Sequence, residues 1–165
     1  MPIQQDLERI ALQERELILA RLDAEIAWQL GTQIRSLAVQ RGLPVVVDVR
    51  RFGQPLFYTA LEGTTPDNVE WVRRKINVVA RFHRSSYAVG LRDTAKNETI
   101  YEAQGLSLAD FATHGGSFPL VVAGAGIVGA VTVSGLPQRA DHELAVEALC
   151  LLLGRDYATL SLAAE

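Results

Sequence analysis

The fold of this chain is decided by residues 117–138, which read SFPLVVAGAGIVGAVTVSGLPQ. The segment carries no charged side chain and is about as long as a membrane-spanning helix requires. Its four glycines, its prolines near both ends and its many valines instead favour strands and a turn. We therefore predict a buried β-hairpin, with strands over 118–123 and 127–134, and no insertion into a membrane.

The turn of this hairpin also matches the dinucleotide-binding pattern G-x-G-x-x-G, over residues 124–129. In that motif the third glycine lies in a helix whose amino end faces the pyrophosphate. Here β-branched residues follow the third glycine, and too little chain remains for a second βαβ half. A hairpin turn is the preferred interpretation, and an NAD site is not expected.

Outward from this hairpin, the sequence predicts a second one and several helices. Strands over 44–49 and 55–60 are joined through a turn that contains Gly53. Asp23 is typical of a helix start, and apolar residues then recur at helical spacing until Gly42. A further helix begins at Thr65-Pro66 and runs to about Arg84. The remaining predicted helices cover about 1–14, 107–113 and about 140–153, while 17–22 is ambiguous between strand and helix and 85–106 stays unassigned.

Hairpins separated by helices predict a central antiparallel sheet covered by helices, which is an α+β fold. We find no internal repeat and no linker rich in proline or serine, so we expect one domain over residues 1–165. The apolar helix over 140–153 and the amphipathic helix over 1–14 each present a face that could pack on the sheet or on another subunit.

Composition excludes several classes of function. The 165 residues carry a net charge of −3, which argues against a protein that binds nucleic acid through bulk positive charge. A single cysteine, Cys150, excludes a disulfide framework and a zinc site built from several cysteines. The first residues are polar and acidic, unlike a signal peptide, so we expect a cytoplasmic protein.

A dense run of basic residues lies between Trp71 and Arg84 on the predicted third helix. Arg74 and Arg81 project away from the apolar stripe of this helix, and Lys75 flanks the stripe. The run can be a solvated basic face. The alternative is a site for carboxylate or phosphate groups, because arginine donors match those oxygens in bidentate geometry. The two serines that follow, Ser85 and Ser86, are interpreted as a helix end or an anion contact.

The three histidines are the other candidates for chemistry. No pair of them has helical metal-binding spacing, so the sequence predicts no metal site. His83 extends an apolar stripe and is interpreted as a core residue. His114 precedes Gly115-Gly116, where a tight backbone leaves room for a ligand, and His142 follows Asp141 at a helix start. A hydrolase site of Ser134 with Asp141 and His142 is discounted, because adjacent side chains on one helix point apart. The catalytic residues stay unknown.

Several segments together resemble the GlcG/HbpS-like, or haem-degrading-domain, superfamily and in particular its uncharacterised cytosolic branch. The resemblance covers roughly residues 5–155. It rests on residues 118–122, 126–135 and 141–143, with further matches at 61–68, Trp71, Lys75, Ser85-Ser86 and Gly115-Gly116. The resemblance implies a profilin-like α/β/α arrangement and a homo-oligomer. It implies no reaction, because none is established for this branch.

Some members of the superfamily bind haem, and the resemblance makes haem a possible cofactor. His114 or His142 could be an axial ligand, and Arg74, Lys75 or Arg81 could hold the propionates, although no C-x-x-C-H attachment sequence is present. We therefore expect a small anionic cofactor or metabolite, with haem as the named candidate, near Gly115-Gly116 and the start of the last helix. The alternative is a structural protein whose self-assembly is its function.

Overall fold

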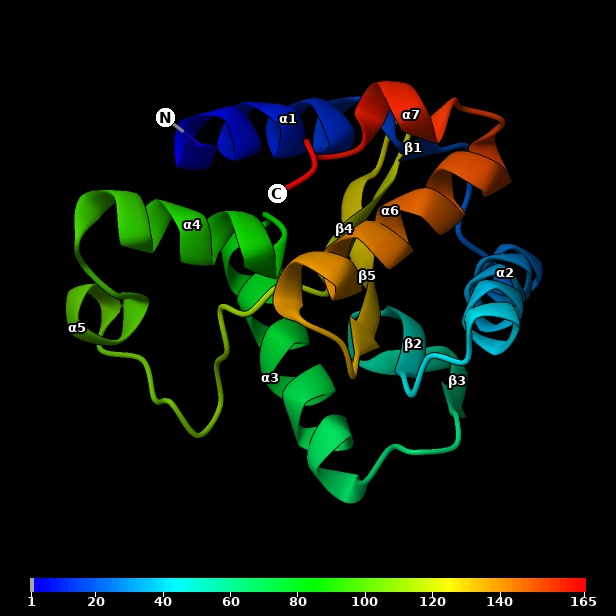
Figure 1. Cartoon of the computed structure of the whole chain (residues 1–165), viewed down its shortest axis with the longest axis horizontal. Helices are drawn as coiled ribbons and strands as arrows, with labels where there is room; N and C mark the ends of the chain where they lie inside the picture. Colours follow the sequence, from blue (N-terminus) through cyan, green and yellow to red (C-terminus); the bar gives the residue numbers. More distant parts are fainter. Residues whose placement is uncertain (1) are drawn as a thin grey trace.

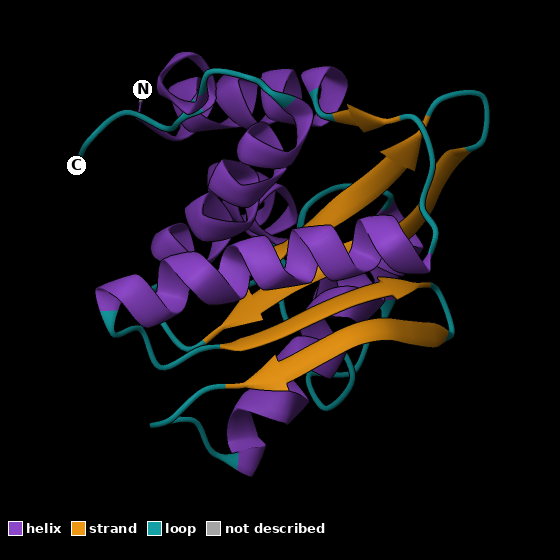
Figure 2. Ribbon diagram, turned by 90° about the vertical axis from the view of Figure 1, so that its right-hand side faces the viewer, coloured by secondary structure: helices purple, strands orange, loops and turns teal. Residues whose placement is uncertain are grey.

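The computed structural model describes residues 2–165, and its centre is a five-stranded sheet in the order β1-β4-β5-β2-β3 (Figure 1). Helices cover both faces of the twisted sheet (Figure 2). The expected α+β class is confirmed. In chain order the strands are β1 (Ile18–Leu19), β2 (Val46–Arg51), β3 (Gln54–Ala60), β4 (Ser117–Val122) and β5 (Gly126–Ser134).

The two predicted hairpins form and lie side by side. β4 pairs antiparallel with β5, β5 with β2, and β2 with β3. Gly129 lies inside β5 opposite Arg51, and a Cβ atom there would collide with the carbonyl oxygen of Arg50. The glycine therefore allows β5 and β2 to approach each other closely. No helix follows the G-x-G-x-x-G spacing, so the dinucleotide-binding motif is not formed.

The expectation of a wholly antiparallel sheet is wrong at one edge. β1 pairs parallel with β4, through Ile18 with Val121 and Leu19 with Val122. A strand of two residues gives no alternating pattern, so the ambiguous sequence over 17–22 could not reveal its direction. Burial of Leu17 and Leu19 at this edge holds the segment in place.

One face of the sheet packs against α2 (Ala24–Arg41) and α6 (Gln138–Leu153). The Asp23 carboxylate accepts the backbone N–H of Ile26, and Gly42 ends α2 in the left-handed conformation, as the sequence predicted. The main core lies here, and each fully buried aliphatic or aromatic side chain contributes about 1.5 to 3 kcal/mol. Its largest members include Phe118, Leu30, Ile34, Leu120 and Leu149.

The opposite face packs against α3 (Pro66–Phe82), which begins with the expected Thr65 cap and proline. Val72 and Ile76 are buried against Val46, whereas Val69 is exposed although it shares the predicted stripe. The sheet residues next to Val46 on this face are polar, because Asp48 pairs with Thr132 and the hydroxyl of Thr132 hydrogen-bonds that of Ser117 at 2.9 Å.

The unassigned stretch after α3 holds two helices, α4 (Ser86–Lys96) and α5 (Ile100–Gln104). Ser85 accepts the backbone N–H of Ala88 and caps α4. The helix predicted over 107–113 is wrong, because the carbonyl of Ser107 accepts only the N–H groups of Asp110 and Phe111 in a tight turn and the chain then leaves.

The two ends of the chain lie together beside α1 (Pro2–Glu16) (Figure 1). The Gln13 side chain donates to the carbonyl of Leu160 in α7 (Tyr157–Leu160) at 2.9 Å. Arg139 forms an ion pair with Asp6 at 2.6 Å. Within residues 2–165, no helix is long and apolar enough to cross a membrane.

Candidate functional site

A pocket of about 230 Å³ opens where α3, the end of β5 and the start of α6 meet. The loop before β4 closes one side of the pocket with His114. Its lining residues come from parts of the chain that are far apart in sequence: Asn68, Trp71, Lys75, His114, Ser134, Gly135, Leu136, Gln138 and Asp141.

A buried ion pair between Lys75 and Asp141 lies at this pocket. Lys75 Nζ is 3.1 Å from Asp141 Oδ2, and each residue is 2% exposed. Lys75 Nζ also donates to the carbonyl oxygen of Val133 at 3.1 Å. The Asp141 carboxylate accepts the backbone N–H groups of Leu136 at 3.0 Å and Gly135 at 3.3 Å. The pair therefore fastens α3 and α6 to the end of β5.

Burial shifts both groups of this pair toward their neutral forms. It lowers the pKa of Lys75, and the neighbouring Asp141 carboxylate opposes that shift. Burial raises the pKa of Asp141 to about 6, against the effect of the Lys75 ammonium and of two backbone N–H groups. A proton can consequently move between the two side chains at a smaller cost than in a solvated pair.

The Gly115-Gly116 sequence makes room for this ion pair. Gly116 has a φ of +136°, and a Cβ atom there would lie 2.7 Å from Lys75 Nζ and would collide with the carbonyl oxygen of Val133. Gly115 donates its N–H to the Gln138 side chain at 3.1 Å. The space that the sequence assigned to a ligand at these glycines is filled by atoms of the protein, with Lys75 Nζ next to Gly116.

His114 and Trp71 form the aromatic wall of the pocket. Their ring centroids lie 4.7 Å apart, nearly perpendicular, and the Arg74 guanidinium lies 4.3 Å from the Trp71 centroid. Burial lowers the pKa of His114, and the positive charges of Lys75 and Arg74 lower it further. His114 is therefore a neutral imidazole in a positive local field at pH 7.

The basic run on α3 has a role that neither sequence interpretation included. Arg73 and Asn77 donate to the carbonyl oxygens of Ala109 and Asp110 at 2.8 and 2.7 Å, and Arg74 donates to that of Leu108 at 3.3 Å. The backbone carbonyl groups of an irregular loop lack the hydrogen-bond donors that a helix or a sheet provides, and these side chains act as donors instead. The run therefore holds the loop that leads to His114, while Arg73 and Arg81 stay exposed to solvent.

Of the other sequence candidates, His142 lies in the core rather than at the pocket. It is 0% exposed, and its Nε2 lies 2.8 Å from the Gln13 side-chain oxygen. The Gln13 amide group already donates to Leu160, so Nε2 carries the proton in this hydrogen bond. Burial lowers the pKa of His142 to about 3. By contrast, His83, interpreted as a core residue, is exposed at the carboxyl end of α3.

Three more candidates lie away from the pocket. Ser85 caps α4, and the hydroxyl of buried Ser86 bonds the backbone N–H of Ser117 at 3.1 Å. Arg81 is exposed and does not line the pocket. The structure brings the candidates His114, Lys75 and Asp141 together at the pocket, with Gly115 and Gly116 next to His114 in the chain and Arg74 one residue from the wall. The other lining residues were not candidates, since only the packing of separate segments creates their common surface: Asn68, Trp71, Ser134, Gly135, Leu136 and Gln138.

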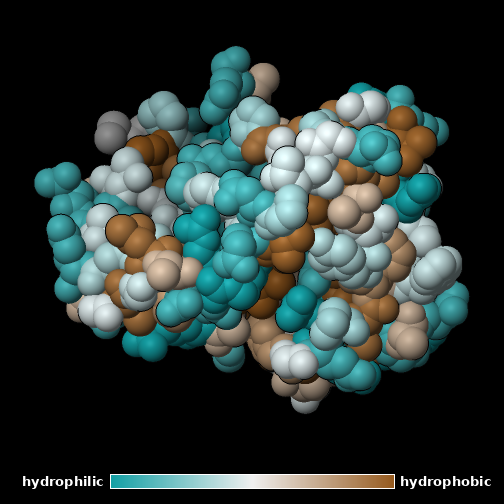
Figure 3. Space-filling model, turned by 90° about the horizontal axis from the view of Figure 1, so that it is seen from below, coloured by the Kyte–Doolittle hydropathy of each residue, from teal (hydrophilic) through white to brown (hydrophobic). Residues whose placement is uncertain are grey.

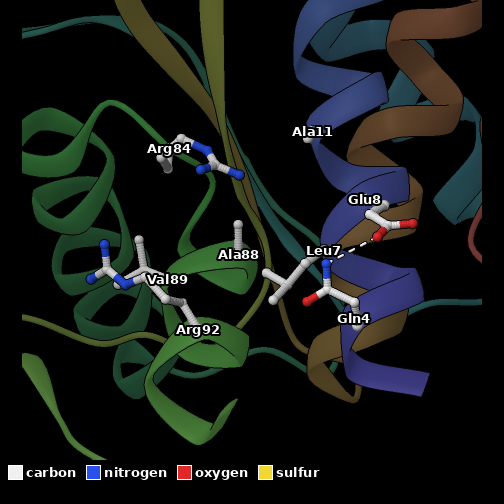
Figure 4. A pocket seen from close by; sticks show the side chains of 8 residues that line it. All are labelled: Gln4, Leu7, Glu8, Ala11, Arg84, Ala88, Val89 and Arg92. Atoms are coloured by element: carbon white, nitrogen blue, oxygen red, sulfur yellow. Dashed lines mark hydrogen bonds between the residues drawn. The ribbon is translucent and has the colours of Figure 1, made fainter. Parts of the chain in front are cut away.

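A second pocket, of about 320 Å³, lies between α1 and α4 (Figure 4). Leu7 and Ala88 line it on opposite sides, and Gln4 donates to Glu8 across one turn of α1. Its Arg84 is already paired with Glu14 at 2.6 Å. No group of three His, Cys, Asp or Glu side chains among residues 2–165 is placed to hold a metal ion. The first pocket therefore combines more of the groups that chemistry requires.

Haem does not fit the first pocket. Sites for drug-sized ligands enclose about 300 to 1,000 Å³, so a volume of 230 Å³ suits a metabolite of a few carbon atoms rather than a tetrapyrrole. Of the two proposed axial ligands, His142 is enclosed by the core and bonded to Gln13. His114 lines the pocket edge but has no enclosed space beside it that would receive the macrocycle.

Comparisons with known proteins agree with this fold. The chain is 60% identical over 162 residues to a UPF0303 protein of Acidobacterium capsulatum, which covers 98% of each chain. It is also 60% identical over 163 residues to a UPF0303 protein of Burkholderia thailandensis, with 99% of each chain covered.

Solved structures extend the comparison. The crystal structure of the Ybr137w protein matches with a TM-score of 0.85 at 27% identity, over 93% of this chain and 92% of that one. A structure described as a PduOC:haem complex has the same fold, with a TM-score of 0.67 at 18% identity, over 78% of this chain and 93% of that one. The family model described as "Haem degrading protein HbpS-like" matches residues 22–150, and the chain belongs to this family.

Proposed function

We propose that this chain is a cytoplasmic protein that binds a small anionic metabolite in the pocket between Trp71, His114 and the Lys75–Asp141 pair. The observation that carries the proposal is the buried ion pair at the wall of a pocket whose one histidine is held neutral by positive charge. Ionisable groups perturbed by burial and by specific partners gather at functional sites.

An anion in this pocket would find donors that the protein leaves available. Among residues 2–165, Lys75 Nζ has two hydrogen-bond partners, and an ammonium group has three N–H donors. The His114 ring and the Asn68 amide line the same space. The field of Lys75 and Arg74 that disfavours a proton on His114 favours a negative charge beside it.

The histidine signals in NMR spectra test this proposal directly, because the chain has three histidines. Lactate at millimolar concentration is expected to raise the pKa of His114, since an anion stabilises the imidazolium, and to leave the chemical shifts of His83 in place. His114→Asn is expected to weaken lactate binding, whereas His83→Asn, at an exposed left-handed position that asparagine tolerates, is its matched control. An unchanged His114 pKa across lactate, pyruvate and inorganic phosphate would refute the proposal.

Haem is tested separately because the PduOC structure is described with haem. From the pocket volume we expect no saturable one-to-one Soret shift when hemin is added to the protein. A saturable shift that disappears in His114→Asn but not in His83→Asn would contradict this expectation and make haem the ligand.

The second candidate function is self-assembly, and we propose a homo-oligomer. The two helices that suggested it, α1 and α6, bury their apolar residues within the chain. Exposed aromatic residues instead lie near the β3 edge, with Trp28 59% and Tyr58 46% exposed. A groove of about 350 Å³ between α3 and β2–β3 includes Tyr58 and Val69. The molecular surface seen from below also has a central strip of apolar side chains (Figure 3).

The mass of the protein in solution tests the assembly. Trp28→Glu in α2 and Tyr58→Glu in β3 are expected to lower the mass of the oligomer, while Leu108→Glu, at an exposed apolar position in a loop, is the control. A monomeric wild-type protein would remove this candidate.

A further inference from the structure

We propose that Lys75 forms a reversible imine with a small aldehyde or 2-oxo acid held in the pocket. This inference rests on the proposed function, because the anionic group of such a compound would occupy the site beside His114. It adds a covalent step and a substrate class, small carbonyl compounds, to the binding of anions.

The use of lysine in this chain is the first argument. The sequence has fourteen arginines and two lysines, Lys75 and Lys96. Arginine forms almost all the ion pairs, as expected where only charge and hydrogen bonds are needed. Of the two lysine amines, that of Lys96 is exposed beside Glu98, and that of Lys75 is buried at a pocket. An amine, unlike a guanidinium, can lose its proton and attack a carbonyl carbon.

The surroundings of Lys75 contain an acceptor for the proton that its ammonium group must lose. Asp141 Oδ2 lies 3.1 Å from Nζ, within reach for direct transfer. Burial acts against the charge on both groups, and the backbone N–H groups of Gly135 and Leu136 keep the Asp141 carboxyl oriented whichever group holds the proton. The acceptor is therefore fixed before a substrate arrives.

The proposed reaction is balanced with water as its only other product. The ammonium proton passes to Asp141, and the Nζ lone pair forms a bond to the carbonyl carbon while the carbonyl π electrons move to oxygen. That oxygen takes the proton from Asp141, which gives a carbinolamine whose nitrogen keeps two protons and the positive charge. One of these protons and the hydroxyl group leave together as water, which gives the protonated imine beside the Asp141 carboxylate. Hydrolysis returns the free lysine and the carbonyl compound, so no oxidant or reductant is needed.

The space next to Nζ suits a small substrate. The absence of a Cβ atom at Gly116 keeps the backbone clear of Nζ, and Trp71 supplies an apolar wall. A carboxylate on the carbon next to the carbonyl group would extend toward the positive field at His114. Two-oxo acids of three or four carbons combine both features within a volume of about 230 Å³.

Reductive trapping tests the inference. The protein is incubated at pH 7 with pyruvate and cyanoborohydride, which reduces an imine to a stable secondary amine, and the modified residue is located by peptide mass spectrometry. We expect Lys75 to be modified faster than Lys96, because burial lowers the pKa of Lys75 and so leaves more free amine at pH 7. Lactate, which has the same charge and no carbonyl group, is the matched control and is expected to give no adduct.

Variants make the outcome unambiguous. Lys96→Arg is expected to leave the adduct yield unchanged, since Lys75 is then the one lysine of the chain. Lys75→Arg is expected to abolish the adduct, and a melting curve shows whether it is folded. Modification of Lys96 or the terminal amine at a rate equal to or above that of Lys75 in the wild-type protein would overturn the inference without any variant. A rise in the His114 pKa with pyruvate but no Lys75 adduct refutes the imine and leaves the proposed function standing. No change in either refutes both.

Discussion

The two faces of the sheet bury different kinds of side chain. The face against α2 and α6 holds aliphatic and aromatic residues such as Leu120 and Val131, in one large cluster. The face against α3 holds Asp48, Thr132 and Ser117, and only a small cluster around Val46 is apolar. The candidate site lies at the end of this polar face, where Lys75 meets Asp141.

This difference indicates a division of labour within one fold. The apolar face supplies most of the free energy of folding, because apolar burial is the dominant favourable contribution. The polar face then tolerates a buried ion pair, whose desolvation can cost as much as the attraction returns. Substitutions on the two faces should accordingly differ in what they damage.

The largest effect is expected on the apolar face. Phe118→Ala removes a fully buried ring that lies against His142 and should lower the free energy of unfolding by about 4 kcal/mol. Urea denaturation measures it, with the exposed Leu108→Ala as a control expected within about 0.5 kcal/mol of wild type. A loss at position 118 below about 1 kcal/mol would contradict the assignment of the core to this face.

On the polar face, Lys75→Met should cost about 3 kcal/mol because it leaves the Asp141 carboxylate buried without its ammonium partner. The double variant Lys75→Met with Asp141→Leu should regain part of this stability, since no buried charge then remains. The same denaturation experiment checks both variants. If the double variant instead loses as much stability as the two single substitutions added together, the two residues do not act as a pair.

Gly116→Ala should cost about 2 to 3 kcal/mol and also abolish ligand binding. Its φ of +136° is unfavourable for alanine, and the new methyl group would strike Lys75 and Val133. Gly42→Ala is the matched control, because Gly42 also has a positive φ but open space around it, and about 1 kcal/mol is expected there. Equal losses at the two positions would mean that Gly116 serves the backbone alone.

The pH dependence of stability distinguishes the contribution of His142 from that of Asp141. His142 has a folded pKa of about 3, below the usual 6.5, so the folded protein binds fewer protons than the unfolded chain between these values. The stability that this group contributes is therefore complete above pH 6.5 and declines as the pH falls, by roughly 2 kcal/mol at pH 5. Asp141, with a raised pKa, acts in the opposite direction between its usual 3.8 and about 6.

Comparison with His142→Gln isolates the histidine, since Asp141 is present in both proteins. The variant should lose less stability than the wild type between pH 7 and pH 5, as measured by thermal melting at each pH. Parallel melting curves for the two proteins would refute a neutral buried His142.

The smallest effect is expected at the loop that covers α3. Arg73→Ala removes exposed ion pairs with Glu70 and Asp110 and one bond to a carbonyl group, so the expected loss of global stability is below about 1 kcal/mol. Hydrogen exchange of residues 108–112 should accelerate at the same time, because the loop is less firmly held. Unchanged exchange would show that Arg74 and Asn77 hold the loop without Arg73.

The parts of the fold that the sequence predicted are those in which local signals agree. Asp23 and Gly42 bound α2, Thr65 with Pro66 begins α3, and valine-rich runs on both sides of glycine form the β4–β5 hairpin. Each of these signals acts over a few residues. α4 was missed because Gly90 and several polar residues dilute its apolar pattern, although Ser85 does cap it.

Three of the candidate residues, Lys75, His114 and Asp141, line one pocket, but the sequence did not indicate their geometry. Lys75 and Asp141 were both candidates, but the sequence separates them by 66 residues and gives no sign of their contact. His142 and His83 were interpreted in the wrong direction for one reason. Helical spacing places a side chain on a face but does not say where that face ends, and α1 covers His142 whereas α3 ends at His83.

The meeting of the two chain ends has a consequence for the order of synthesis. Helix α1 leaves the ribosome first, yet the carbonyl group that Gln13 needs belongs to a residue 147 positions later. At about 5 to 20 residues per second, this partner follows by about 7 to 30 seconds. The apolar stripe of α1 can meet Tyr87 and Ala88 midway through synthesis, but the contacts of this helix with Leu160 and Leu162 must wait until translation is nearly complete. The closure of the two chain ends on each other is therefore the last step of folding on the ribosome.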